Sequence, residues 1–145
     1  MYRAIVALLL ITACSGSPSG PTGEWFRDLR NATRRWEAAA VSDYSYTYTR
    51  SCFCPQQVLR VTVQGGVVQS IRDIEADTMH KAPLTDLSIG GLLDTIAVKL
   101  SNRPADAVIE YHATFGYPVS TMFDPIAKAV DDENGFQVSG FESIP

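Results

Sequence analysis

The apolar residues of the chain repeat at two different periods, which separate predicted helices from predicted strands. From Glu24 onwards the repeat is close to 3.6 residues, as on one face of an amphipathic helix. Thr22 or Gly23 can cap this helix, and Glu24 lies favourably near the positive end of the helix dipole. The apolar stripe consists of Trp25, Leu29, Ala32, Trp36 and Ala40.

A second helical stripe lies in the middle of the chain. Its apolar residues run from Leu87 to Leu100 at the spacing of one helix face. Asp86 or Ser88 can serve as the N-cap, and the helix is expected to end near Asn102, because a proline follows. The residues before it, Glu75 to Thr85, predict a polar loop.

Six segments alternate between the two faces that a strand presents, with many β-branched and aromatic residues. In the first of them the tyrosines, Arg50, Cys52 and Cys54 share one face. The pair Gly65-Gly66 joins the second segment to the third, and both glycines can take the positive φ of a type I′ hairpin. The expected strands are Tyr44 to Cys54, Val58 to Gln64, Val67 to about Ile74, Ala107 to Ala113, Val119 to Asp124 and Phe136 to Phe141.

The order of these elements is helix, three strands, helix, three strands. Phe115 to Pro118 predicts the first turn of the second half, and Asn134-Gly135 the last one. This order favours an α+β fold, in which two helices pack on one face of an antiparallel sheet of about five or six strands. Most of the tyrosine row is expected to pack under the helices, and one domain should span residues 24–145.

The N-terminus has the pattern of an export signal. Arg3 precedes eight apolar residues, Ala4 to Ile11, too few for the roughly 20 that a membrane-spanning helix needs. The next residues, Ile11-Thr12-Ala13-Cys14, resemble a bacterial lipobox. That resemblance implies that residues 1–13 are a signal peptide and that Cys14 receives a diacylglyceryl group and a further acyl chain such as palmitate. The alternative is an ordinary secretory signal in which Cys14 lies near the cleavage site by chance.

Residues 14–23 predict a flexible tether, because all those after Cys14 are Ser, Gly, Pro or Thr. Two acyl chains give stable membrane anchoring, so membrane lipid is the first expected partner. The expected location is therefore the cell envelope, with the domain facing the periplasm or the extracellular side.

Composition excludes several classes of protein. A chain of 145 residues that is 46% hydrophobic and 19% charged can bury a core, so disorder is excluded for most of it. The net charge of −4 has the wrong sign for a nucleic-acid-binding protein. No Gly-rich phosphate loop, nucleophile elbow or helical His pair indicates an enzyme, and no cofactor is expected.

The pair Cys52 and Cys54 is the clearest candidate for chemistry. An exported domain favours a disulfide, although two cysteines at i and i+2 need a bend in the strand to bridge. A redox-active or metal-binding pair is the second interpretation, since Arg50 on the same face would favour a thiolate. Buried reduced thiols are the third.

Metal ligands are otherwise scarce. His80 is expected in a loop and His112 on a strand, and neither has the spacing of a zinc site. The acidic group Asp131, Asp132 and Glu133 lacks the alternation of a calcium loop and predicts a charged turn, so no metal is expected. Asp132 or Glu133 can instead pair with Arg50, because an inward-facing guanidinium needs a partner.

A series of landmarks from about Trp36 to the C-terminus resembles the bacterial envelope proteins catalogued as domain of unknown function 6174. The resemblance implies an exported or lipidated protein and no established activity. His112 departs from the family, which tends to place an Asp there. The landmarks are Trp36, Tyr44-x-Tyr46-x-Tyr48-x-Arg50-Ser51-Cys52-Phe53-Cys54-Pro55, Val61-x-Val63, Gly66-Val67, Val108-x-x-Tyr111, Gly116-Tyr117-Pro118, Asp124 and Asp131-Asp132-Glu133.

The function expected from the sequence is that of a non-catalytic binding or accessory module. Its partner would be an unidentified envelope protein or a glycan, and Tyr117, in a turn, is a candidate contact residue. The alternative is a thiol redox or metal-handling protein that uses Cys52 and Cys54.

Overall fold

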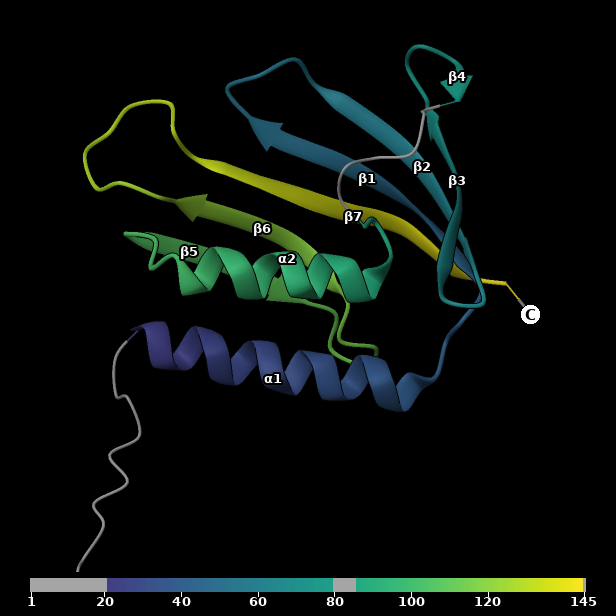
Figure 1. Ribbon diagram of the computed structural model, residues 1–145, viewed down its shortest axis with the longest axis horizontal. Helices are drawn as coiled ribbons and strands as arrows, with labels where there is room; N and C mark the ends of the chain where they lie inside the picture. Colours follow the sequence, from purple (N-terminus) through teal and green to yellow (C-terminus); the bar gives the residue numbers. More distant parts are fainter. Residues whose placement is uncertain (1–20, 80–85, 145) are drawn as a thin grey trace, which may run out of the picture.

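A computed structural model describes residues 21–79 and 86–144 (Figure 1). The predicted signal peptide, Cys14 and His80 lie outside the described residues. The described part contains two helices and seven strands. They are α1 (Pro21–Ala39), β1 (Tyr44–Cys52), β2 (Gln57–Gln64), β3 (Val67–Asp73), β4 (Thr78–Met79), α2 (Ile89–Ser101), β5 (Asp106–Tyr111), β6 (Pro118–Asp124) and β7 (Asn134–Ser143).

The strands form one sheet in the order β4-β3-β2-β1-β7-β6-β5, and every neighbouring pair is antiparallel. The sequence predicted five or six strands, and the additional one is β4, which lies inside the predicted polar loop. It pairs with the end of β3, where Arg72 faces Met79 and Asp73 faces Thr78. A strand of two residues is too short to produce a period, so the sequence pattern did not reveal it.

Both helices pack against the face of the sheet that carries the tyrosines of β1. Tyr46 donates its hydroxyl proton to the carbonyl of Leu87, and the N–H of Ile89 donates to the Tyr44 hydroxyl at 2.8 Å. The Trp36 ring of α1 meets the Tyr44 ring edge-on at 5.3 Å. These contacts fix the start of α2 and the end of α1 on the same face, which confirms the α+β arrangement.

The helix boundaries differ little from those expected. α1 begins at Pro21 rather than Glu24, so the last three residues of the predicted tether are helical. Proline fits the first turn because its missing N–H would be unpaired there. Ser88 caps α2, as predicted, by accepting a hydrogen bond from the N–H of Gly91, and Asn102 ends the helix. No helix in residues 21–79 and 86–144 is long and apolar enough to cross a bilayer.

The predicted turn at Asn134-Gly135 is wrong, because both residues belong to β7. A Cβ on Gly135 would lie 1.9 Å from the carbonyl oxygen of Thr121 in β6. The glycine is therefore needed for the close approach of two strands and not for a turn. The chain turns instead in residues 125–133, and β1 ends at Cys52, two residues before the predicted end.

Candidate functional site

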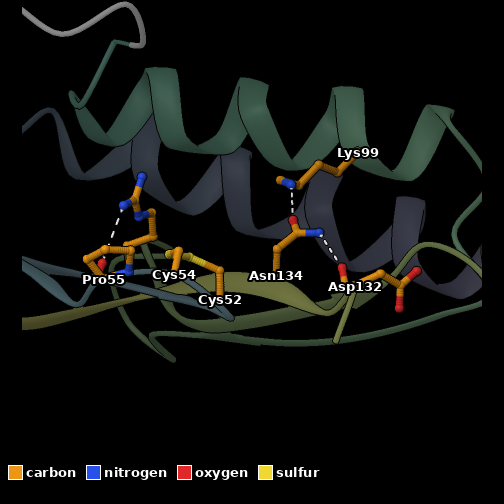
Figure 2. Close-up of a disulfide and its surroundings, with 7 residues drawn as sticks. Cys52, Cys54, Pro55, Lys99, Asp132 and Asn134 are labelled. Atoms are coloured by element: carbon orange, nitrogen blue, oxygen red, sulfur yellow. Dashed lines mark hydrogen bonds between the residues drawn. A yellow bond between two sulfur atoms is a disulfide. The ribbon is translucent and has the colours of Figure 1, made fainter. Parts of the chain in front are cut away.

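The residues with the most distinctive chemistry meet where β1 ends, β7 begins and α2 ends (Figure 2). Cys52, the last residue of β1, lies directly opposite Asn134, the first residue of β7. Lys99 extends from the last turn of α2 to the same Asn134. Three elements that are distant in the sequence therefore place a disulfide, an amide and a cation at one end of the sheet.

Cys52 and Cys54 form a disulfide with their Cα atoms 5.2 Å apart. The N–H of Cys54 donates to the carbonyl of Cys52 at 2.8 Å, which is the bend that bridging requires. Phe53, between the two cysteines, is turned outwards and is 82% exposed. The structure therefore has the first of the three predicted states of this pair, a disulfide.

Lys99 is a half-buried cation held by an amide. Its Nζ donates to Oδ1 of Asn134 and lies 5.2 Å from the centre of the Phe123 ring. The Nδ2 of Asn134 donates in turn to the carbonyl of Asp132 at 3.1 Å. Burial lowers the pKa of the Lys99 ammonium group. Within residues 21–79 and 86–144, Lys99 forms no ion pair with a carboxylate.

A cavity of about 120 Å³ opens beside this lysine. At the roughly 30 Å³ that a water molecule occupies in the liquid, its volume corresponds to about four waters, so it suits a small chemical group rather than a large cofactor. The wall combines one cation and two amides with apolar ring surface. The lining residues are Lys99, Asn102, Pro104, Phe123, Pro125 and Asn134.

Arg50 and the acidic residues, predicted to pair, are not brought together. Arg50 is exposed, and its Nη2 donates to the carbonyl of Pro55 at 3.4 Å. Asp132 accepts the N–H of Ile126 at 3.1 Å through Oδ2, while its Oδ1 is buried without a hydrogen-bond partner. Glu133 is exposed. Since the Arg50 guanidinium stays in contact with water, it does not need the carboxylate that an inward position would require.

Tyr117 lies away from this cavity, in the connection between β5 and β6. Its ring stacks with those of His112 and Phe141, at a centroid distance of 4.6 Å in each pair. Burial raises the pKa of its hydroxyl. His112 accepts the N–H of Phe115 through Nδ1 at 3.1 Å, so it is a hydrogen-bonded, partly buried histidine. Because Tyr117 is half-buried among these rings, only part of its ring is available to a partner.

Residues 28–143 match the pattern of a family of unknown function, DUF6174. The chain belongs to this family. The match covers α1 from its second turn through β7 and therefore includes the whole cavity and the disulfide. Comparison with curated proteins found no match for this DUF6174 protein. The family is one of unknown function, so membership assigns no activity to this chain.

Lys99 and Asn134 are the residues of the DUF6174 site that the sequence did not single out. Lys99 lies in the last turn of a largely apolar helix, where a cation also complements the helix dipole. Asn134 was assigned to a turn. Their contact joins residues 35 apart in the sequence, so neither residue alone indicates it. In the described part of the chain no three His, Cys, Asp or Glu residues are grouped as metal ligands.

Proposed function

We propose that this DUF6174 protein is a lipid-anchored protein of the bacterial cell envelope that acts as a non-catalytic binding module. The lipobox-like residues that end in Cys14 support the anchor. The disulfide between Cys52 and Cys54 supports a location outside the cytosol, because disulfides persist in oxidising compartments. The partner would be an envelope protein or a glycan.

The observation that carries the binding role is the cation at the edge of the cavity. Removing an ammonium group from water is unfavourable unless a counter-charge or hydrogen bonds compensate it. Lys99 has the amide oxygen of Asn134, the ring of Phe123 and the end of the helix dipole, but no carboxylate among the described residues. A ligand carboxylate in the cavity would supply that charge. We therefore infer that the cavity binds a carboxylate group that belongs to the protein or glycan partner.

A matched pair of small ligands tests this assignment. N-acetylglycine carries a carboxylate, and its amide has nearly the same size and no charge. We expect N-acetylglycine to shift the NMR signals of Lys99, Asn102 and Asn134, with a Kd in the millimolar range, and the amide to leave them unchanged. Binding should weaken as the pH rises through the pKa of Lys99, because the neutral amine no longer attracts the anion.

Lys99→Met is the informative variant and Lys128→Met the matched control, since Lys128 is an exposed lysine of the β6–β7 connection. Lys99→Met should abolish the carboxylate-dependent shifts, and Lys128→Met should retain them. Equal responses to the acid and the amide, or an unchanged response in Lys99→Met, would exclude a carboxylate site in this cavity.

Thiol redox chemistry at Cys52 and Cys54 is a second candidate. Cys52 faces Asn134, which Lys99 contacts, so a thiolate at Cys52 would lie near a cation that favours it. An external dithiol would supply two electrons, reduce the bridge to two thiols and become a disulfide itself. Ready reduction by millimolar dithiothreitol, and a higher thiol pKa in Lys99→Met, would support this role. Resistance to the reductant would identify an inert bridge.

A further inference from the structure

Three strongly exposed apolar side chains lie at the same end of the sheet as the disulfide. Phe53 is 82% exposed, Val130 84% and Ile126 64%, and we call them the tip residues. Phe53 belongs to the connection after β1, and the other two belong to the connection between β6 and β7. Since Cys52 and Phe123 both lie opposite Asn134, the two connections leave the sheet at one end.

The start of α1 is at this end too (Figure 1). From Cys14 to Pro21 the chain advances 21 − 14 = 7 residues, which span at most about 25 Å when fully extended. α1 itself is 19 residues long, or about 28 Å. If Cys14 is acylated, as the proposed function holds, the end of the domain with the tip residues is therefore the end held close to the lipid.

We propose that the tip residues dock on the bilayer and enter its interfacial region when the lipid anchor is in place. This inference rests on the proposed function and adds a second, non-covalent contact with the membrane. Apolar side chains at a membrane surface are stabilised by leaving water, and the effect adds to that of the acyl chains.

The turn at Phe53 is built to hold that side chain outwards. The disulfide closes the chain between Cys52 and Cys54, and the hydrogen bond between their backbones tightens the same turn. A side chain held in place loses less conformational entropy when it binds than a side chain on a free loop does. The bridge thus contributes to docking by presenting Phe53.

The charges at this end favour apolar docking over attraction to anionic lipids. The connections 53–56, 102–105 and 125–133 carry Arg103 and Lys128 against Asp131, Asp132 and Glu133, and the exposed guanidinium of Arg50, which is hydrogen-bonded to Pro55, brings their net charge to 3 − 3 = 0. A surface without net charge gains little from anionic headgroups. Docking should therefore occur on vesicles of phosphatidylcholine alone.

Depth-dependent fluorescence quenching tests the proposal on the full-length protein purified from membranes and reconstituted in brominated phosphatidylcholine vesicles. Val130→Trp places an indole at the tip. Val67→Trp is the matched control, because Val67 is 62% exposed and lies at the opposite end of the sheet, after the β2–β3 turn. Relative to the unsubstituted chain, whose Trp25 and Trp36 also fluoresce, we expect the added indole of Val130→Trp to be quenched at least twofold more strongly than that of Val67→Trp, and to show a blue shift that the Val67→Trp indole lacks.

Three results would overturn the docking. The first is equal quenching in the two variants while the N-terminal peptide has the mass of acylated Cys14, which leaves the anchor intact. The second is a concentration-dependent blue shift of Val130→Trp without vesicles, which would assign the tip residues to a contact between two copies of the chain. The third is Cys14 without lipid and no selective quenching, in which case the anchor fails as well.

Discussion

Removal of the disulfide should cost little stability, because the bridge closes a very short loop. A bridge between residues 52 and 54 closes a loop of three residues and so lowers the entropy of the unfolded chain. At 25 °C this entropy loss corresponds to about 1.6 kcal/mol in the free energy of unfolding. Phe53 and Cys54 are exposed, so no core contact depends on them. The double variant Cys52→Ser/Cys54→Ser should therefore fold and lose about 1.6 kcal/mol, or roughly 5 to 8 °C in Tm.

Urea unfolding, followed by circular dichroism, measures this loss in four samples. These are the wild-type chain and the double variant, each with and without dithiothreitol. Reduced wild type should unfold at nearly the same urea concentration as the double variant, and the variant should not respond to the reductant. A loss above about 3 kcal/mol, or failure of the variant to fold, would show that the bridge does more than close this loop, because closing a three-residue loop cannot supply that much entropy.

Three further predictions concern the fold around the site. Gly135→Ala should lower the free energy of unfolding by about 3 kcal/mol or more, measured with urea, because the added Cβ would lie 1.9 Å from a carbonyl oxygen. The control Gly90→Ala should lose no stability, because its added Cβ would lie 3.8 Å from the nearest atom. Equal losses would contradict the close approach of β6 and β7. Tyr44→Phe should lose about 1 to 3 kcal/mol, because the N–H of Ile89 is left without its acceptor; an unchanged stability by calorimetry would exclude that role. Burial raises the pKa of both Tyr44 and Tyr46 above the usual tyrosine value of about 10, so their contribution to stability is complete below pH 10 and is lost as the pH rises further, at up to about 1.4 kcal/mol per pH unit for Tyr46. Urea midpoints that stay constant between pH 9 and pH 11 would contradict this.

The long elements were predictable because their periods extend over many residues. The alternation of β1 and the 3.6-residue stripe of α2 each depend on which side chains face the core, and the core contacts of Tyr44 and Tyr46 agree with that pattern. β4 was not predictable. Its two residues are fixed only by pairing with Arg72 and Asp73 on a neighbouring strand.

The candidate site was predictable only in part. Cys52 and Cys54 are only two residues apart in the sequence, so their proximity needs no knowledge of the fold. Asn134-Gly135 has the composition of a turn, and only the close approach of β6 explains its place in a strand. The contact of Lys99 with Asn134 depends on how α2 lies over the sheet, which no local pattern encodes.

We propose that a lipid on Cys14 holds this DUF6174 domain at a membrane. Mass spectrometry of the N-terminal peptide can establish whether it does, on protein isolated from the membrane fraction of the native host. We expect a peptide that begins at Cys14 and has the added mass of a diacylglyceryl group, with or without a further acyl chain. A peptide with an unmodified Cys14, or one that begins at a different residue, would contradict it.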